Sequence, residues 1–304
     1  MTRTIAAVCL SALLAMILSV LTPPAWAGPL RMGILPVLDT LPLQVADREG
    51  LFQDQGLDVE LVPFASALER DTAMQSGRLD GYFGDLVATL LLIRSGVPMR
   101  IATVSWSSSP GQRMFAVMRA PKDAAAEPPT VGISRSTVME FLLDAMAKRH
   151  GLPLGRWEVV EVKKIPIRMQ MLLQGQLSMA LLPEPLAGLA ESRGATVVAT
   201  DEMLDMPLTV LCLRKDLPAA ELRAFLRAYD QAVAELTARP ECYRALMAET
   251  CRIPPDLARD FPVYTYPGPR LPSADEVNVV QDWMVQKGML DAQLPLADLL
   301  PEAL

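Results

Sequence analysis

Short strand-like apolar runs alternate with single helical patterns along two successive stretches of the chain. In the first stretch, Arg31–Leu35 has the pattern of a strand and Leu41–Glu49 that of a helix, and the alternation continues to Val104. The second stretch, 131–199, repeats the same order of elements. Strands separated by single helices form parallel βαβ units. The pattern predicts an α/β fold with two similar lobes, although the residues of the two stretches are too different to identify a repeat.

The segments that separate the two stretches define the expected lobe boundaries. Residues 120–129 are rich in proline, alanine and charge, as a crossover between lobes or a surface loop would be. Met206–Arg214 is a strand-like run that could lead the chain back, and mainly helical patterns follow it. We therefore expect lobe 1 to contain residues 28–119 and 207–304, and lobe 2 to contain residues 120–206. Two segments, near Arg119 and at Met206–Pro207, would then connect the lobes.

Residues 1–27 have the pattern of a cleaved signal peptide. Arg3 supplies a positive charge, Ile5–Leu21 is almost wholly apolar, and Ala25–Ala27 has the small-x-small form that signal peptidase recognises. A retained membrane anchor is the alternative, because an apolar run of about 17 residues is at the lower limit for spanning a bilayer. We expect cleavage after Ala27 and export of a soluble protein.

Charge and cysteine content agree with an exported globular protein. The chain has 28 basic and 35 acidic residues without basic clusters, which argues against nucleic acid and anionic lipid as partners. In an oxidising compartment Cys242 and Cys251 could form a disulfide, which we expect, although two buried thiols on one helix face are the alternative. Cys212 lies in an apolar run and is expected to be an inert core residue.

Four blocks of residues resemble those of a known family. They are Val45–Phe52 with Gly56–Glu60, Met74–Gly81, Gly96–Ile101, and Gly175–Ala180 with Leu182–Pro185. Together they resemble the periplasmic substrate-binding proteins of ABC importers, in the group for nitrate, taurine, sulfonates and thiamine precursors. The family often has aspartate where this chain has Ser178, a departure outside the expected ligand groove.

The resemblance implies a type II periplasmic binding fold, in which two α/β lobes joined by a two-segment hinge close on a ligand in the cleft between them. It also implies a periplasmic protein that captures a small solute and delivers it to the permease of an ABC transporter with its ATPase. We expect the protein to act as a monomer, without a cofactor or a metal.

The loops at the carboxyl ends of parallel strands are the expected ligand site, because open α/β sheets bind ligands there. The ligand-binding candidates are Asp39, Thr40, Leu41, Phe64, Ser66, Asp85 and Trp106 from lobe 1, and Ser134, Arg135, Ser136, Thr137 and Glu184 from lobe 2. Ser134–Thr137 opens a helix, where free N–H groups and hydroxyls suit an anion. With Asp39 and Asp85 opposite, the site favours an aminosulfonate or an aminopyrimidine over nitrate, which would face buried carboxylates.

Each candidate also has a purely structural interpretation. Four short polar side chains could be helix N-caps: Asp39, Ser66, Asp85 and Ser136. Trp106 could be a core residue, Arg135 could point to solvent, and Glu184 could brace the interface between the lobes.

Two other functions are alternatives to solute delivery. A pyrimidine-synthesis enzyme of the same fold would use its own histidine and iron, but His150, the only histidine, is expected to face solvent at a helix end. The sequence has no Cys/His cluster with metal-ligand spacing and no nucleophile elbow, P-loop or dinucleotide fingerprint, so we expect a binding protein and not an enzyme. The other alternative is a sensory protein that binds a solute and docks on a receptor.

Overall fold

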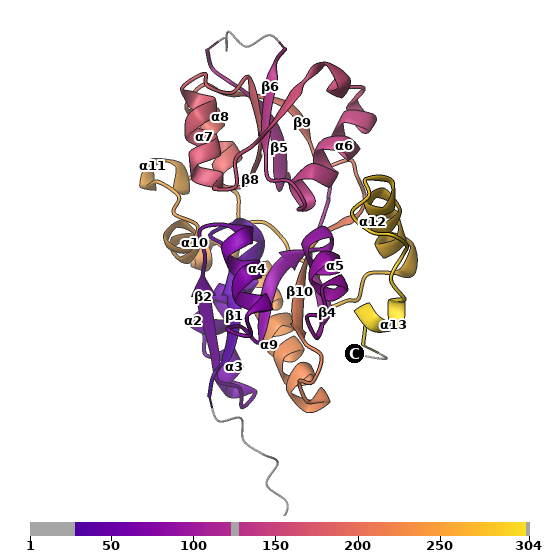
Figure 1. Ribbon diagram of the computed structural model, residues 1–304. Coiled ribbons are helices and arrows are strands. Elements are labelled where there is room, and N and C mark those ends of the chain that lie inside the picture. Colours follow the sequence, from indigo (N-terminus) through magenta and orange to yellow (C-terminus); the bar gives the residue numbers. More distant parts are fainter. Residues whose placement is uncertain (1–27, 123–127, 302–304) are drawn as a thin grey trace, which may run out of the picture.

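Two α/β lobes make up the protein, each built on one five-stranded sheet (Figure 1). The computed structural model describes residues 28–122 and 128–301. The predicted signal peptide, residues 1–27, lies outside the described residues, as does part of the predicted crossover at 120–129. The prediction of a two-lobed α/β fold is confirmed. No helix in the described ranges combines the length and the apolar character needed to cross a membrane.

The sheet of lobe 1 has the strand order β2-β1-β3-β10-β4. Its strands are β1 (Leu30–Ile34), β2 (Val59–Pro63), β3 (Gly81–Asp85), β4 (Met99–Ser107) and β10 (Pro207–Arg214). β1 pairs in parallel with β2 and β3, whereas β10 is antiparallel to both β3 and β4. The strand predicted at Met206–Arg214 therefore returns the chain to lobe 1 as an inner, antiparallel strand.

The sheet of lobe 2 repeats this arrangement with the strand order β7-β6-β8-β5-β9. Its strands are β5 (Phe115–Arg119), β6 (Thr130–Ile133), β7 (Glu158–Glu161), β8 (Met179–Pro183) and β9 (Thr196–Thr200). β6 pairs in parallel with β7 and β8, and β5 is antiparallel to β8 and β9. In each sheet the fourth place is therefore taken by the antiparallel strand next to a crossing between the lobes.

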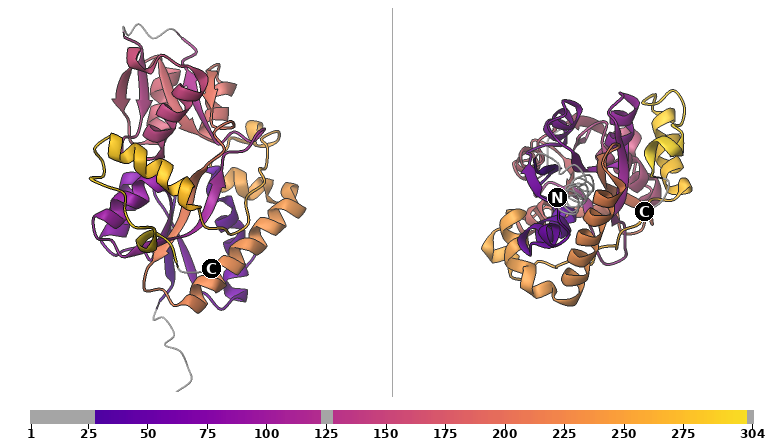
Figure 2. Two further views of the ribbon diagram at one scale, coloured as in Figure 1. Left: turned by 90° about the vertical axis from the view of Figure 1, so that its right-hand side faces the viewer. Right: turned by 90° about the horizontal axis from the view of Figure 1, so that it is seen from below.

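Helices cover the sheets and extend the C-terminal part of the chain (Figures 1 and 2). In lobe 1 these are the 3₁₀ helix η1 (Leu38–Thr40), α2 (Leu41–Arg48), α3 (Leu51–Asp54), α4 (Ala67–Gln75) and α5 (Leu86–Arg94). Lobe 2 has α6 (Val138–His150), η2 (Leu154–Arg156), α7 (Ile165–Leu173) and α8 (Leu186–Ser192). The C-terminal part has α9 (Ala219–Ala238), η3 (Pro240–Tyr243), α10 (Arg244–Thr250), α11 (Pro255–Ala258), α12 (Ala274–Gln286) and α13 (Leu296–Leu299).

The similarity of the two lobes extends to their buried side chains. Arg70 of α4 and Arg168 of α7 are both almost fully buried. Each packs on a glycine of the equivalent strand, β1 or β6, and a Cβ added to Gly33 or to Gly132 would lie 2.6 Å from a leucine Cδ1 and 3.2 Å from the arginine Cγ. In both lobes a leucine and an arginine therefore leave no room for a side chain at this position. This correspondence is visible in space, whereas sequence similarity between the lobes is too weak to show it.

The chain crosses into lobe 2 earlier than the boundary expected after residue 119. Strand β5 pairs with β8 and β9, so residues 115–119 belong to the second sheet. The outgoing and returning segments meet where the N–H of Ser108 donates to the carbonyl of Met206 (2.9 Å) and the N–H of Met206 donates to Ser108 Oγ (3.0 Å). Beside them, Asp201 Oδ1 accepts from the N–H groups of Met114 (2.9 Å) and Phe115 (2.8 Å). These bonds hold together the segments that cross between the lobes, where the hinge is expected.

The expected disulfide between Cys242 and Cys251 is not formed. Cys242 is exposed in η3, whereas Cys251 is buried at the end of α10, so the intervening helix turns the two thiols toward different surroundings. Cys212 is buried in β10, as expected. Burial raises the pKa of both Cys212 and Cys251 to about 12. Both therefore stay as protonated thiols at neutral pH.

We predict that one of the three cysteines beyond residue 27 reacts with a thiol reagent in the folded protein. In protein that lacks residues 1–27, Cys242 should react with dithionitrobenzoate in buffer, and all three thiols should react in guanidinium without a reductant. The Cys242→Ser variant should lose the native reaction. A count of one thiol in non-reducing guanidinium would instead demonstrate a Cys242–Cys251 bridge.

Candidate ligand-binding site

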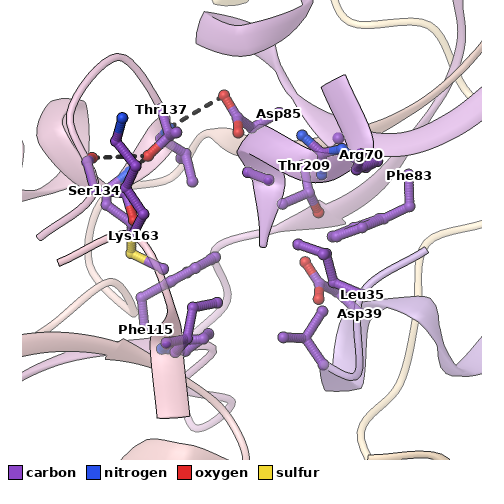
Figure 3. Close-up of a pocket in the computed structure, with 17 residues that line it drawn as sticks. Leu35, Asp39, Arg70, Phe83, Asp85, Phe115, Ser134, Thr137, Lys163 and Thr209 are labelled. Carbon is purple, nitrogen blue, oxygen red and sulfur yellow. Dashed lines mark hydrogen bonds between the residues drawn. The ribbon is translucent and has the colours of Figure 1, made fainter. Parts of the chain in front are cut away.

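A narrow cavity of about 50 Å³ lies between the lobes and is lined by residues of both (Figure 3). Most of the wall is apolar, with side chains such as Leu35, Phe83 and Phe115, and a few polar groups converge on it. An apolar cavity with a few placed polar groups is typical of small-molecule sites. The cavity lies at the carboxyl ends of the parallel strands, the position that the rule for open α/β sheets predicts.

Asp85 joins the two lobes across this cavity. Its Oδ1 accepts from the N–H of Ala88 (2.9 Å) in the first turn of α5 and from the N–H of Val138 (3.1 Å), the first residue of α6 (Figure 3). The negative charge lies at the positive ends of two helix dipoles, one from each lobe. Burial raises the pKa of Asp85 to about 6, against the opposing effects of Arg70 and of these N–H groups. Asp85 is thus both the N-cap of α5 and a link between the lobes.

Asp39 is buried in η1 and lines the same cavity. It is not an N-cap, since no side-chain cap bond forms at the start of η1 or of α2. Burial raises the pKa of Asp39 to about 7, and a hydrogen bond with Thr209 opposes that rise. Asp39 Oδ2 is buried without a hydrogen-bond partner among the described residues.

The candidates at Ser134–Thr137 divide between two connected cavities. Ser134 and Thr137 line both the inner cavity and a wider one of about 400 Å³, whereas Arg135 and Ser136 line only the wider one. Arg135 is half exposed, with Nη1 3.7 Å from Glu140 Oε1, as its solvent-facing interpretation predicts. Thr137, and not Ser136, caps α6, with its Oγ1 accepting from the N–H of Met139 (3.2 Å). The wider cavity therefore shares part of its lining with the inner one.

Several candidates are built into the lobes and do not line the cavity. Thr40 Oγ1 donates to the carbonyls of Leu35 (3.1 Å) and Val37 (2.8 Å), and Leu41 is fully buried in the core. Ser66 is the N-cap of α4, and Phe64 packs against two clusters of buried apolar side chains.

Trp106 is also a core residue and not a wall of the cleft. It is 1% exposed, and its ring centroid lies 5.5 Å from that of Tyr264 and 5.6 Å from that of Tyr266. The two tyrosines come from the C-terminal segment, which folds over the end of β4 and encloses the indole.

Glu184 is not among the residues that line the cavity, and its backbone, not its side chain, contacts lobe 1. Its Oε1 lies 2.7 Å from Arg113, and its Oε2 accepts from the N–H of Gly188 (2.9 Å). The carbonyl of Glu184 accepts from the N–H of Leu38 in lobe 1 (3.3 Å). Burial raises the pKa of Glu184, and Arg113 opposes that rise. The side chain is therefore occupied within the protein.

Three polar residues that the sequence analysis did not name also line the cavity: Arg70, Lys163 and Thr209. Lys163 follows β7, so the rule for strand ends could have found it. Arg70 lies within a helix and Thr209 within an antiparallel strand, positions to which that rule does not apply. Their approach to the cavity depends on the packing of α4 and on the insertion of β10 into the sheet.

Arg168 supports the cavity wall from within lobe 2. Its Nη1 donates to the carbonyl of Leu181 (2.8 Å), and its Nη2 donates to the carbonyl of Val162 (2.7 Å) and to Ser134 Oγ. Burial lowers the pKa of Arg168 to about 9. These bonds hold Ser134 in place at the boundary of the two cavities.

No group of three or more His, Cys, Asp or Glu side chains is placed to hold a metal ion within residues 28–122 and 128–301. His150 is exposed at the end of α6, and one of its ring nitrogens lies 3.3 Å from the carbonyl of Thr200. The expected solvent-facing position of this histidine is confirmed.

Solved structures of binding components from ABC-type import systems share this fold. A ligand-binding component from Staphylococcus aureus with zinc bound is 16% identical and has a TM-score of 0.73, with 90% of this chain and 96% of that chain covered. The periplasmic aliphatic sulphonate-binding protein SsuA of Escherichia coli is 15% identical, with a TM-score of 0.73 and coverage of 91% and 92%.

The alkanesulfonate-binding protein of Xanthomonas axonopodis pv. citri, bound to MOPS, is a third similar structure. It is 16% identical, with a TM-score of 0.72 and coverage of 88% of this chain and 95% of that chain. At these identities the similarity establishes the fold, and the expected type II periplasmic binding fold is confirmed.

No curated protein matches the chain in sequence. A family model does match, over residues 26–253, which are most of the chain. The chain therefore belongs to the NMT1-like family.

Proposed function

We propose that the protein is the extracytoplasmic solute-binding component of an ABC importer. In this function it captures a small polar molecule between its lobes and delivers it to the transporter permease with its ATPase. The observation that carries the proposal is the cavity itself, which both lobes enclose and into which Asp39, Asp85, Ser134 and Thr137 bring polar groups. The similar solved structures are binding components of such importers or sulfonate-binding proteins, which supports the same function here.

The hinge supports capture by closure. Two segments cross between the lobes and hydrogen-bond to each other at Ser108 and Met206, so rotation about this region would open or close the cavity. A solute between the lobes would contact both of them and stabilise the closed form. The closed form is the one that we propose docks on the permease, with the protein acting as a monomer in the periplasm.

The walls of the cavity favour a small solute with both an apolar part and a polar part. Leu35, Phe83 and Phe115 would contact the apolar part, whereas hydroxyls and carboxylates would contact the polar part. An aminosulfonate, a sulfonate or a pyrimidine-like molecule fits this description. We propose no catalytic step, because the proposal assigns the residues around the cavity to solute binding alone.

We predict that a true solute raises the unfolding temperature of the protein in proportion to the logarithm of its concentration. A ligand that binds only the folded state stabilises it by about 2.7 kcal/mol at one hundred times the Kd. The measurement is thermal unfolding against sulfonates, pyrimidines, amino acids and oxyanions, with glucose as an unrelated control. Absence of a shift with every compound would contradict solute capture.

We predict that Asp85→Ala separates the lobes, because it removes the acceptor shared by Ala88 in lobe 1 and Val138 in lobe 2. The radius of gyration from small-angle X-ray scattering should increase, and stability should fall by about 1 kcal/mol from loss of the cap. The matched control is Ser66→Ala, which removes the N-cap of α4, another nine-residue helix of lobe 1, but no bond between lobes. Equal radii of gyration for the two variants would contradict the role of Asp85 as a link.

A further inference from the structure

Asp39 presents an unsatisfied acceptor to the cavity. Its side chain is 2% exposed, and its Oδ2 has no hydrogen-bond partner among the described residues (Figure 3). A buried carboxylate oxygen without a donor is costly, because it has lost its hydration and gained nothing in exchange. A donor on the solute would form a charge-assisted hydrogen bond with this oxygen, and that bond would increase the affinity for the solute.

The cations that line the cavity are already paired with other carboxylates. Arg70 donates to Asp71 Oδ1 from Nε (2.9 Å) and from Nη2 (2.7 Å), and it also lies over the ring of Tyr82, 4.6 Å from the centroid. Lys163 is exposed, with Nζ 3.7 Å from Glu161 Oε1. No hydrogen bond or ion pair joins either cation to Asp39 within the described residues. The cavity therefore keeps an uncompensated acceptor at Asp39.

The start of α6, where an anion would be expected to bind, is occupied by groups of the protein itself. The N–H of Val138 donates to Asp85 (3.1 Å), and that of Met139 donates to Thr137 Oγ1 (3.2 Å). The N–H of Ser136 donates to Glu140 Oε2 (2.8 Å). A sulfonate or nitrate would have to displace these acceptors and lie beside the negative charge of Asp85. The sequence-based expectation of an anion site at Ser134–Thr137 therefore has no free N–H to support it at these three positions.

We infer that the cleft recognises its solute through a nitrogen hydrogen-bond donor, an ammonium or an amino group, that pairs with the Asp39 carboxylate, while Asp85 excludes anionic groups from the start of α6. This inference rests on the proposed function and narrows its solute class. The shared chemistry is the nitrogen donor, which an alkylamine or an amino-substituted heterocycle could supply. An anionic group elsewhere on the same solute would have to point toward the wider cavity that Arg135 and Ser136 line.

The test compares pairs of probes that differ in the amino group. Isothermal titration calorimetry on protein that lacks residues 1–27 would use taurine against ethanesulfonate, and 4-aminopyrimidine against pyrimidine. We expect the amino member of at least one pair to bind about tenfold or more tightly than its partner, and the pair that responds separates an alkylamine from a heterocycle. This comparison needs no variant, so it stands even where a substitution impairs folding.

A matched pair of variants then assigns the effect to Asp39. Asp39→Asn should weaken binding of the amino probe by about tenfold or more, and it should leave the non-amino partner unchanged. The control is Asp80→Asn, since Asp80 is another carboxylate of lobe 1, is bonded within that lobe to Arg31 and Arg214, and does not line the cavity. Asp80→Asn should bind the amino probe as the unaltered protein does.

The pH profile gives an independent readout. A protonated amine pairs with ionised Asp39, so its affinity should be constant well above pH 7 and fall as the pH drops through about 7. The groups that face Asp39 are Thr209, Asp201, Arg70, Tyr229, Tyr266 and Cys251. Burial keeps the two tyrosines and the cysteine protonated in this range. Loss of the profile in Asp39→Asn and its retention in Asp80→Asn would attribute it to Asp39.

Two results would overturn the inference. If ethanesulfonate or nitrate binds as tightly as the amino probes and Asp39→Asn changes nothing, the donor inference is wrong and the proposed function stands. If no probe binds at any concentration tested, the inference falls, and thermal unfolding against the wider panel of solutes decides whether the proposed function falls with it.

Discussion

One carboxylate oxygen, which accepts from the first turns of two helices, joins the two lobes across the cavity. Asp85 ends strand β3 and caps α5, and the same oxygen accepts from the start of α6 in the other lobe. Parallel βαβ units make this possible, because in each lobe the helices begin at the carboxyl edge of the sheet and the two edges face each other. Burying Asp85 costs solvation, which two helix dipoles and nearby Arg70 offset. The link between the lobes and the electrostatics of the cavity therefore depend on the same residue.

The C-terminal part adds ties between the lobes that do not pass through the cleft. Trp283 of α12 donates from Nε1 to Asp144 Oδ2 of α6 (2.8 Å), and its ring lies 5.3 Å from that of Phe141. Lys287 Nζ lies 2.8 Å from the same Asp144 oxygen. Figure 2 shows α12 at the level where the lobes meet. If the lobes open as we propose, these contacts between α12 and α6 would have to break or shift. Helix α12 would therefore restrain the opening.

Buried ionisable groups are divided between structure and site. Arg70 and Arg168 hold equivalent positions in the two lobes, but Arg70 has a carboxylate partner and Arg168 is bonded to carbonyls and to Ser134. Glu184 is satisfied by Arg113 and Gly188, and Asp201 Oδ1 by two N–H groups of the hinge. Asp39 differs from these because its unsatisfied oxygen belongs to a residue of the cavity wall. The other buried groups maintain the fold, whereas we infer that the Asp39 oxygen is available to a solute.

From the sequence alone, the alternation of apolar runs and helices determined the α/β class, the two lobes and the edge where the site lies, because these depend on local periodicity. Asp39, Asp85, Ser134 and Thr137 follow from the same rule and do line the cavity. Only the tertiary structure decided that β5 joins lobe 2, that Trp106 is enclosed by Tyr264 and Tyr266, and that Arg70 reaches the cavity. Each of these depends on contacts between residues far apart in the chain, which local patterns do not encode.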